Sequence, residues 1–149
     1  MRELRQFRLR RRARAALRGL TMPEPFSVQA LCDEVARVRG RKLFLHPFTE
    51  PPVDEMPSGL WVATDVADHV FFEQQTSRFH QEHIICHEIG HMLCGHESQR
   101  AMARTSYTTA QEHEAEMVAT LILELARRRT PPATETERRI SDVLGLSDE

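Results

Sequence analysis

Five consecutive residues carry the groups of a hydrolytic metal site: His87, Glu88, Ile89, Gly90 and His91 form the pattern H-E-x-x-H. Two histidines four positions apart stand on one face of a helix, so both imidazoles can reach one Zn2+. Glu88 projects beside them and can take a proton from a metal-bound water. The pattern therefore predicts a metal-assisted hydrolytic centre, and the competing interpretation is a pair of core histidines on a buried helix.

The motif lies within a predicted amphipathic helix over residues 78–96. Thr76 or Ser77 can cap its start, and Gly95 lies near its end. Its apolar positions are Phe79, Ile84, Ile85, Ile89, Met92 and Leu93. Gly90 costs roughly 1 kcal/mol in a helix interior relative to alanine. A residue this small allows another segment, or a substrate backbone, to approach the metal face.

A third ligand is needed, because a catalytic zinc takes three protein ligands and leaves one position for water. A second helical pattern, over residues 111–126, carries Glu112, Glu114 and Glu116 in its first turn. Acidic residues there also stabilise a helix through the macrodipole, which is the ordinary interpretation. One carboxylate that faces the first helix would complete a site of two histidines and one glutamate, with Glu112 and Glu114 as the candidates.

The segments HEIGHMLCGH and EHEAEMVATLIL together resemble the ImmA/IrrE family of metallopeptidases. That family's pattern is H-E-[LI]-G-H-x-L-x-x-H, followed by E-x-x-A-[ND]-x-F-A-x-x-L-L. The resemblance covers about residues 59–126, where GLWVATDVADHVFFE is also similar to small actinobacterial members. Aligning Ala115 with the family alanine implies Glu112 as the third ligand. Glu116 then takes the Asn or Asp position, where a partner of a ligand histidine is expected, and departs from the pattern by one methylene.

Several residues around the motif are further candidates for chemistry. His96 resembles a frequent histidine of the family, and either orients a carboxylate, stabilises a transition state or meets the helix dipole. Tyr107 either donates to an oxyanion or packs as a loop aromatic. Cys94 lies on the same helix face as the two histidines, where a thiolate could bind the metal or sense oxidants. His83, one turn before His87, is interpreted as an exposed residue rather than as a partner of the site.

Composition and charge limit the class of protein. The chain has 149 residues, of which 40% are hydrophobic, which predicts one domain with one core over 1–149. Residues 1–18 hold eight arginines against one glutamate. The segment 1–20 is therefore a predicted basic helix that packs one side on the domain, or that contacts nucleic acid or an acidic partner. Three cysteines without a signal-like or membrane-spanning run predict reduced thiols, no membrane and a cytoplasmic location, with Cys32 and Cys86 packed in the interior.

The rest of the chain alternates helical and extended patterns. The predicted elements are helices over 27–39 and 134–144, a strand over 42–46, and a hairpin of 60–64 and 69–73 around the turn 65–68. Residues 47–58 and 97–109 are predicted loops, and 130–149 a tail with the short last helix. These elements favour an α+β fold, mainly helical and zincin-like, with a small antiparallel or mixed sheet packed on the H-E-x-x-H helix. The hairpin over 60–73 is the candidate edge for binding substrate backbone.

The resemblance implies a zinc-dependent regulatory endopeptidase, in which His87, His91 and Glu112 hold Zn2+ and Glu88 is the general base. Such sites also accept Mn2+ or Fe2+. Family members cleave or inactivate a helix-turn-helix repressor in a stress or DNA-damage response, so a separate repressor is the expected substrate. The alternative is a zinc-binding, non-proteolytic regulatory or toxin–antitoxin-type partner of a transcription factor. Glu88 argues against it, because structural zinc needs no general base.

Overall fold

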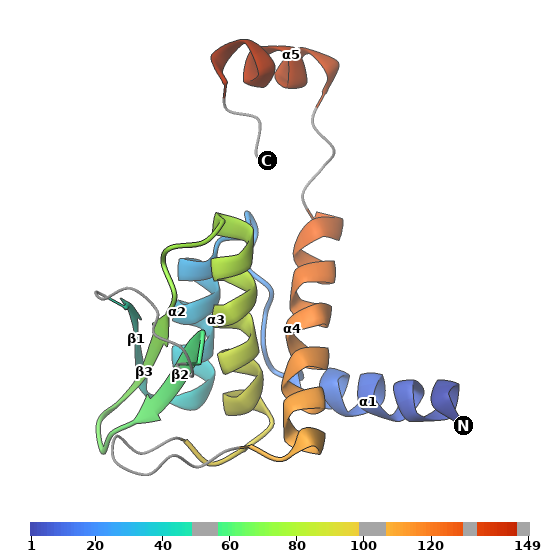
Figure 1. The fold of residues 1–149 in the computed structure, drawn as a ribbon, viewed down its shortest axis with the longest axis vertical. Helices are drawn as coiled ribbons and strands as arrows, with labels where there is room; N and C mark the ends of the chain where they lie inside the picture. The colour runs from blue at the N-terminus through green and yellow to red at the C-terminus, as the bar shows by residue number, and fades with distance from the viewer. Residues whose placement is uncertain (49–56, 99–106, 130–133, 146–149) are drawn as a thin grey trace.

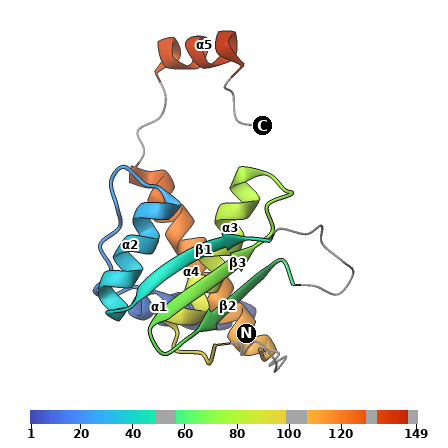
Figure 2. The same cartoon turned by 90° about the vertical axis from the view of Figure 1, so that its left-hand side faces the viewer.

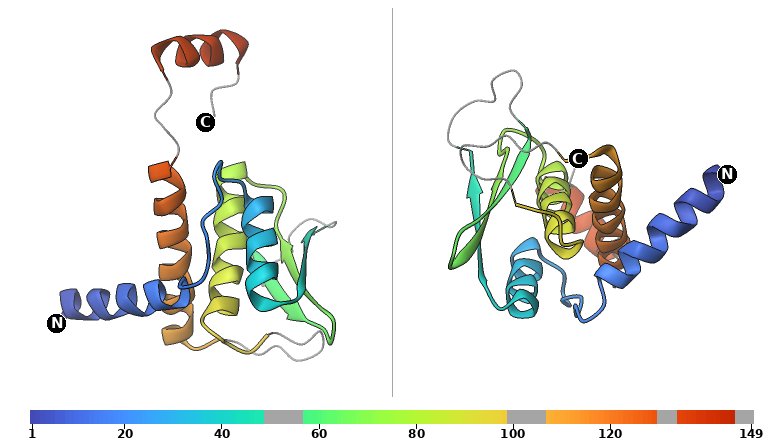
Figure 3. Two further views of the ribbon diagram at one scale, coloured as in Figure 1. Left: turned by 180° about the vertical axis from the view of Figure 1, so that it is seen from behind. Right: turned by 90° about the horizontal axis from the view of Figure 1, so that it is seen from below.

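The computed structural model describes residues 1–48, 57–98, 107–129 and 134–145. Its elements are α1 (Arg2–Ala16), α2 (Val28–Arg39), β1 (Lys42–Pro47), β2 (Gly59–Ala63), β3 (Ala67–Phe72), α3 (Arg78–Leu93), α4 (Thr109–Arg129) and α5 (Glu135–Leu144). The sheet forms one layer, α2 and α3 the next, and α4 the third, while α1 crosses the outer side of α4 (Figures 1 and 3). None of the helices in this described part is long and apolar enough to cross a membrane.

The sheet is mixed, in the order β1-β3-β2 (Figure 2). β1 runs parallel to β3, with Leu45 opposite Val70, and β2 runs antiparallel to β3, with Trp61 opposite Val70. The predicted α+β class and the predicted hairpin are therefore confirmed. The proposed substrate edge over 60–73 was too broad, because β3 lies in the centre of the sheet and, of the two hairpin strands, β2 is the edge strand.

Asp68 shows where the predicted turn was wrong. It was assigned to the turn of the hairpin, but it belongs to β3 and is 1% exposed. Arg39 at the end of α2 lies 2.8 Å from its carboxylate, and the Trp61 indole donates to the same group at 3.1 Å. A buried charge needs such partners, and here they attach α2 to the sheet.

The helix that carries the H-E-x-x-H motif begins and ends through local backbone chemistry. Of the two predicted caps, Ser77 is the one used: its hydroxyl accepts from the His80 amide at 3.1 Å. The helix ends at Leu93, three residues earlier than predicted, because Gly95 takes a left-handed conformation with φ 74°. His96 therefore lies beyond the last turn, where its backbone amide donates to the His91 carbonyl at 3.1 Å.

The glutamate-bearing helix α4 is longer than the predicted 111–126. It begins at Thr109, because the Thr108 hydroxyl accepts from the Gln111 amide at 3.1 Å while the Gln111 side chain accepts from the Thr108 amide at 3.0 Å. The helices predicted over 27–39 and 134–144 are confirmed as α2 and α5, and the strand predicted over 42–46 as β1. The predicted loops over 47–58 and 97–109 lie largely outside the described residues.

The core lies between the sheet, α2, α3 and α4. Its most deeply buried side chains include Leu31, Val35, Val70, Ile89, Met92, Val118 and Ile122. Cys32 and Cys86 are both buried in it, as predicted. α3 is the central helix of this core, so the groups of its motif are held by packing on two sides.

α1 packs on the domain through one half only. Ala13 is its one buried residue, and the next most covered positions are Leu9, Arg10, Ala16 and Leu17. Residues 1–8 are all exposed, and Leu4 and Phe7 keep 52% and 60% of their surface. The basic helix predicted over 1–20 is shorter in the structure, where α1 ends at Ala16. Its first half projects from the body (Figure 1).

Candidate metal centre

Three side chains from α3 and α4 converge on one point. Nε2 of His87 lies 3.0 Å from one carboxylate oxygen of Glu112, and Nε2 of His91 lies 3.3 Å from the other. One donor atom from each of the three lies within 4.8 Å of the others. Two imidazole nitrogens and one carboxylate are a donor set that Zn2+ takes in catalytic sites. The structure thus brings together the three residues predicted as metal ligands.

Two buried atoms at this point favour a metal over a simple ion pair. Nε2 of His91 and Oε2 of Glu88 are both buried without a hydrogen-bond partner among the described residues. Burial beside His87 and His96 lowers the pKa of His91 to about 3, so its imidazole is neutral and keeps a lone pair. An unpartnered buried nitrogen with a free lone pair fits a metal ligand.

The outer nitrogen of His87 is fixed by Glu116. The distance from Nδ1 of His87 to the Glu116 carboxylate is 2.9 Å, and Nε2 of His83 lies 2.7 Å from the other oxygen. The extra methylene of glutamate therefore does not prevent this contact. The interpretation of His83 as an isolated exposed residue was wrong: it is half-buried and shares this carboxylate. Hydrogen bonding to His87 lowers the pKa of Glu116, so an ionised partner orients the ligand ring.

Glu88 stands beside the ligands in a nearly closed environment. It is 6% exposed, and burial raises its pKa from 4.5 to about 7. β2 crosses directly above it: a Cβ on Gly59 would lie 2.6 Å from Ile84 and 3.0 Å from a carboxylate oxygen of Glu88. Only glycine fits there. A carboxylate with a pKa near 7 can both accept and return a proton at neutral pH.

The close approach of α4 to α3 depends on Gly90. A Cβ at this position would lie 2.5 Å from the carbonyl oxygen of Ala115, closer than side chains and backbone come in folded proteins. The glycine within the motif thus allows backbone-to-backbone contact with the helix that carries Glu112. This contact sets the depth of the site, because Glu112 stands less than one helical turn before Ala115.

A second group of side chains lies behind His91. Nδ1 of His96 lies 2.9 Å from Nδ1 of His91, and Nε2 of His96 lies 2.8 Å from the Glu114 carboxylate. Donor atoms of Cys94, His96 and Glu114 lie within 4.8 Å of one another. Glu114 and Cys94, the alternative ligands, therefore belong to this group rather than to the one around Glu112. Burial raises the pKa of the Cys94 thiol to about 11, which keeps it protonated.

Tyr107 lines one side of the candidate metal centre. Its ring stacks on the His91 imidazole, with centroids 3.7 Å apart and planes 13° from parallel. Its hydroxyl is buried and has no hydrogen-bond partner among the described residues. The packing interpretation of Tyr107 agrees with this contact, and its role as an oxyanion donor stays a prediction.

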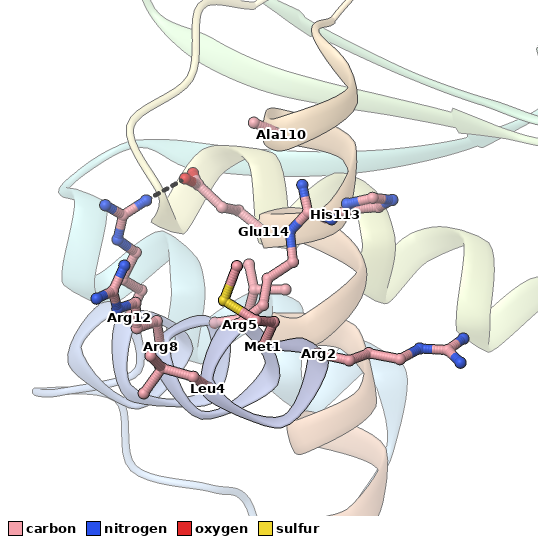
Figure 4. Close-up of a pocket in the computed structure, with 10 residues that line it drawn as sticks. Met1, Arg2, Leu4, Arg5, Arg8, Arg12, Ala110, His113 and Glu114 are labelled. Atoms are coloured by element: carbon pink, nitrogen blue, oxygen red, sulfur yellow. Dashed lines mark hydrogen bonds and ion pairs between the residues drawn. The ribbon is translucent and has the colours of Figure 1, made fainter.

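A groove lies outside the metal centre. It has a volume of about 810 Å³ and lies between α1 and the start of α4 (Figure 4). It is lined by Met1, Arg2, Leu4, Arg5, Arg8, Leu9, Arg12, Ala110, His113 and Glu114. Arg12 donates to Glu114 at 3.0 Å across it. The sequence pattern gave no signal for this pair, which joins residues 102 positions apart.

Comparison with family models, with curated proteins and with solved structures finds no match to this chain. The arrangement of the residues in the centre can hold a divalent cation between two imidazoles and a carboxylate, with a buried base beside it.

Proposed function

We propose that the protein is a zinc-dependent regulatory endopeptidase with a zincin-like centre of the ImmA/IrrE type. One observation carries the proposal: the Nε2 atoms of His87 and His91 converge on the Glu112 carboxylate, while Glu88 stands buried beside them. A structural zinc site needs four closed ligands and no base. Three ligands and a carboxylate with a raised pKa are what hydrolysis requires.

Bound zinc would supply a water of lowered pKa at this point, and Mn2+ or Fe2+ can occupy the same ligands. Glu88, buried beside the three ligands, would serve as the general base toward that water and as the general acid toward the leaving amine. Glu116 and His96 hold the outer nitrogens of the two ligand histidines, which keeps their Nε2 atoms directed at the metal. The free edge of β2 lies next to Glu88, and it can bind a substrate chain as an added strand.

The resemblance suggests the substrate class: a separate helix-turn-helix repressor, cleaved in a stress or DNA-damage response. The alternative function is a zinc-binding partner that holds a transcription factor without cutting it. Glu88→Gln separates the two, because it keeps the ligands and removes the base. New N-termini that appear in cells with the wild type, and not with Glu88→Gln, support the protease. Identical N-termini with both proteins favour the binding partner.

The metal is tested first, by elemental analysis of the purified protein. We expect about one zinc per chain in the wild type and none in His87→Ala or Glu112→Ala. Zinc retained in Glu112→Ala would move the third ligand to Glu114 or Cys94. A metal-free wild type would contradict the proposal, because the two imidazoles and the Glu112 carboxylate would then be an ion-paired cluster.

The projecting half of α1 supports a second candidate function, contact with nucleic acid. Arg2, Arg5 and Arg8 are exposed and form no ion pair with other described residues. Each arginine that neutralises a phosphate makes DNA affinity fall more steeply with salt. Replacing all three by alanine should reduce the salt dependence of binding to a short duplex by about three units of slope. Unchanged affinity and slope would exclude this contact.

A further inference from the structure

The Nδ1 atoms of the two proposed ligand histidines, His87 and His91, have different partners. His87 contacts a carboxylate directly, that of Glu116 at 2.9 Å. Nδ1 of His91 lies instead 2.9 Å from another imidazole, His96, which in turn lies 2.8 Å from Glu114. The second oxygen of Glu114 accepts from Arg12 of α1 at 3.0 Å (Figure 4). A continuous chain of three contacts thus runs from the ring of a ligand to the surface helix.

The protons in this chain have one arrangement that suits a metal. If Nε2 of His91 binds a cation, the proton of that neutral ring sits on Nδ1 and points at Nδ1 of His96. His96 must accept there, so it carries its own proton on Nε2 and donates to Glu114. Arg12 orients that carboxylate by donating to its other oxygen. Without Glu114, His96 can hold its proton on Nδ1, where it would face the proton of His91.

We infer that Glu114 and Arg12 are a positioning pair, which fixes the tautomer of His91 through His96 and thereby sets the metal affinity of the centre. The inference rests on the proposed metal site and adds a contribution from α1. Neither residue touches the metal or a substrate. Partners of this kind typically change metal affinity by about 10–100-fold.

The same side chains have a competing use, since Cys94, His96 and Glu114 could hold a cation of their own. That arrangement removes the proton from Nε2 of His96 and forces it onto Nδ1, against the proton of His91. The two uses therefore exclude each other. Arg12, already bound to Glu114, favours the hydrogen-bonded chain.

The chain is tested by zinc affinity, measured by competition with a chromophoric chelator at neutral pH. We expect about tenfold weaker binding in Glu114→Ala, an intermediate loss in Glu114→Gln, and about threefold weaker binding in Arg12→Ala with partial recovery in Arg12→Lys. Arg10→Ala is the matched control, because Arg10 makes the other α1–α4 ion pair, with Glu124 at 3.3 Å. It should bind zinc like the wild type.

A second readout follows the proton itself. Nitrogen-15 shifts of the imidazoles in the zinc-loaded protein should show His96 protonated on Nε2 in the wild type, with the Nδ1 form appearing in Glu114→Ala. Equal zinc affinity and equal shifts in the two proteins would overturn the inference and leave the metal centre intact. Two zinc ions per chain, reduced to one in Cys94→Ser, would overturn it in favour of a second site. A wild type that binds no zinc would remove the proposed function as well.

Discussion

α4 has two helical neighbours, and the two contacts are of opposite kinds. With α3 it meets backbone to backbone at Gly90, and buried apolar side chains such as Ile89 and Ile122 surround that point. With α1, whose one buried residue is Ala13, the contact is largely at the surface, and the ion-paired side chains of Arg10 and Arg12 remain 40% and 73% exposed. The ligands of the centre come only from the first pair of helices. The packed contact fixes their geometry, and the charged contact can adjust it without holding the fold.

The two contacts also differ in how much they contribute to the free energy of folding. Truncating a fully buried aliphatic side chain such as Ile89 or Ile122 to alanine costs about 2–5 kcal/mol. An exposed ion pair contributes about 0–1 kcal/mol, since solvent screens it and both side chains lose conformational freedom. The α3–α4 contact therefore dominates the stability of the domain.

Gly90→Ala tests the packed contact most severely. The added Cβ would lie 2.5 Å from the Ala115 carbonyl, so α4 must move away from α3. We expect a loss of about 2 kcal/mol or more in the free energy of unfolding, despite the gain of roughly 1 kcal/mol in helix propensity. Chemical denaturation of the metal-free protein measures it.

The control for this variant is His80→Ala, on the exposed side of the same helix. It should change the free energy of unfolding by less than about 0.5 kcal/mol. Gly90→Ala should also weaken zinc binding, because Glu112 moves with α4. A stable Gly90→Ala protein with unaltered zinc affinity would show that the α3–α4 contact does not set the geometry of the site.

Glu88→Gln tests how much stability is lost by burying the Glu88 carboxylate. Burial raises the pKa of Glu88 from 4.5 to about 7, so the folded protein binds this proton more tightly than the unfolded chain. Its stability therefore falls as pH rises from 4.5 to 7 and stays lower above that range. Without its metal, Glu88→Gln should be more stable than the wild type at pH 8, by about 3 kcal/mol. At pH 4 the two should be equal, and a constant difference at both pH values would contradict the buried charge.

The helix that carries the H-E-x-x-H motif could be predicted from the sequence because its information is local. His87, Glu88 and His91 have fixed spacing on one helix, and Ser77 and Gly95 mark its ends within a few residues. Glu112 lies on a second helix, so the spacing within the motif could not identify it. The resemblance to the family pattern predicted it as the third ligand. The small mixed sheet followed from short β-type runs, although its strand order required contacts between residues far apart in the chain.

The remaining features depend on tertiary contacts that no local pattern encodes. Asp68 looks like a turn residue until Arg39 and Trp61 surround it. Glu114 looks like a competing ligand until His96 and Arg12 bind it. The sequence did indicate the role of His83, because this residue lies four positions before His87 on one helix face. A carboxylate shared by two histidines requires that spacing, and Glu116 provides it.

The variants Arg10→Ala and Arg12→Ala test the two ion pairs between α1 and α4. Each removes one α1–α4 ion pair between partly exposed side chains. The two variants should lose similar, small amounts of stability, under about 1 kcal/mol each. They should differ only in zinc affinity, where Arg12 is joined to His91 through Glu114. A large loss of stability in either one, measured by denaturation, would mean that α1 holds the fold.

Removal of residues 2–8 should have the smallest effect of all. These residues are exposed, and the ion pairs of Arg10 with Glu124 and of Arg12 with Glu114 do not involve their side chains. We expect the free energy of unfolding to stay within about 0.5 kcal/mol of the wild type and zinc affinity to be unchanged. Only binding to nucleic acid or to an acidic partner should weaken. A loss of more than about 1 kcal/mol would contradict this expectation. It would mean that the projecting half of α1 packs on the body in solution, and the two contacts of α4 would then differ less than their ion pairs and packing indicate.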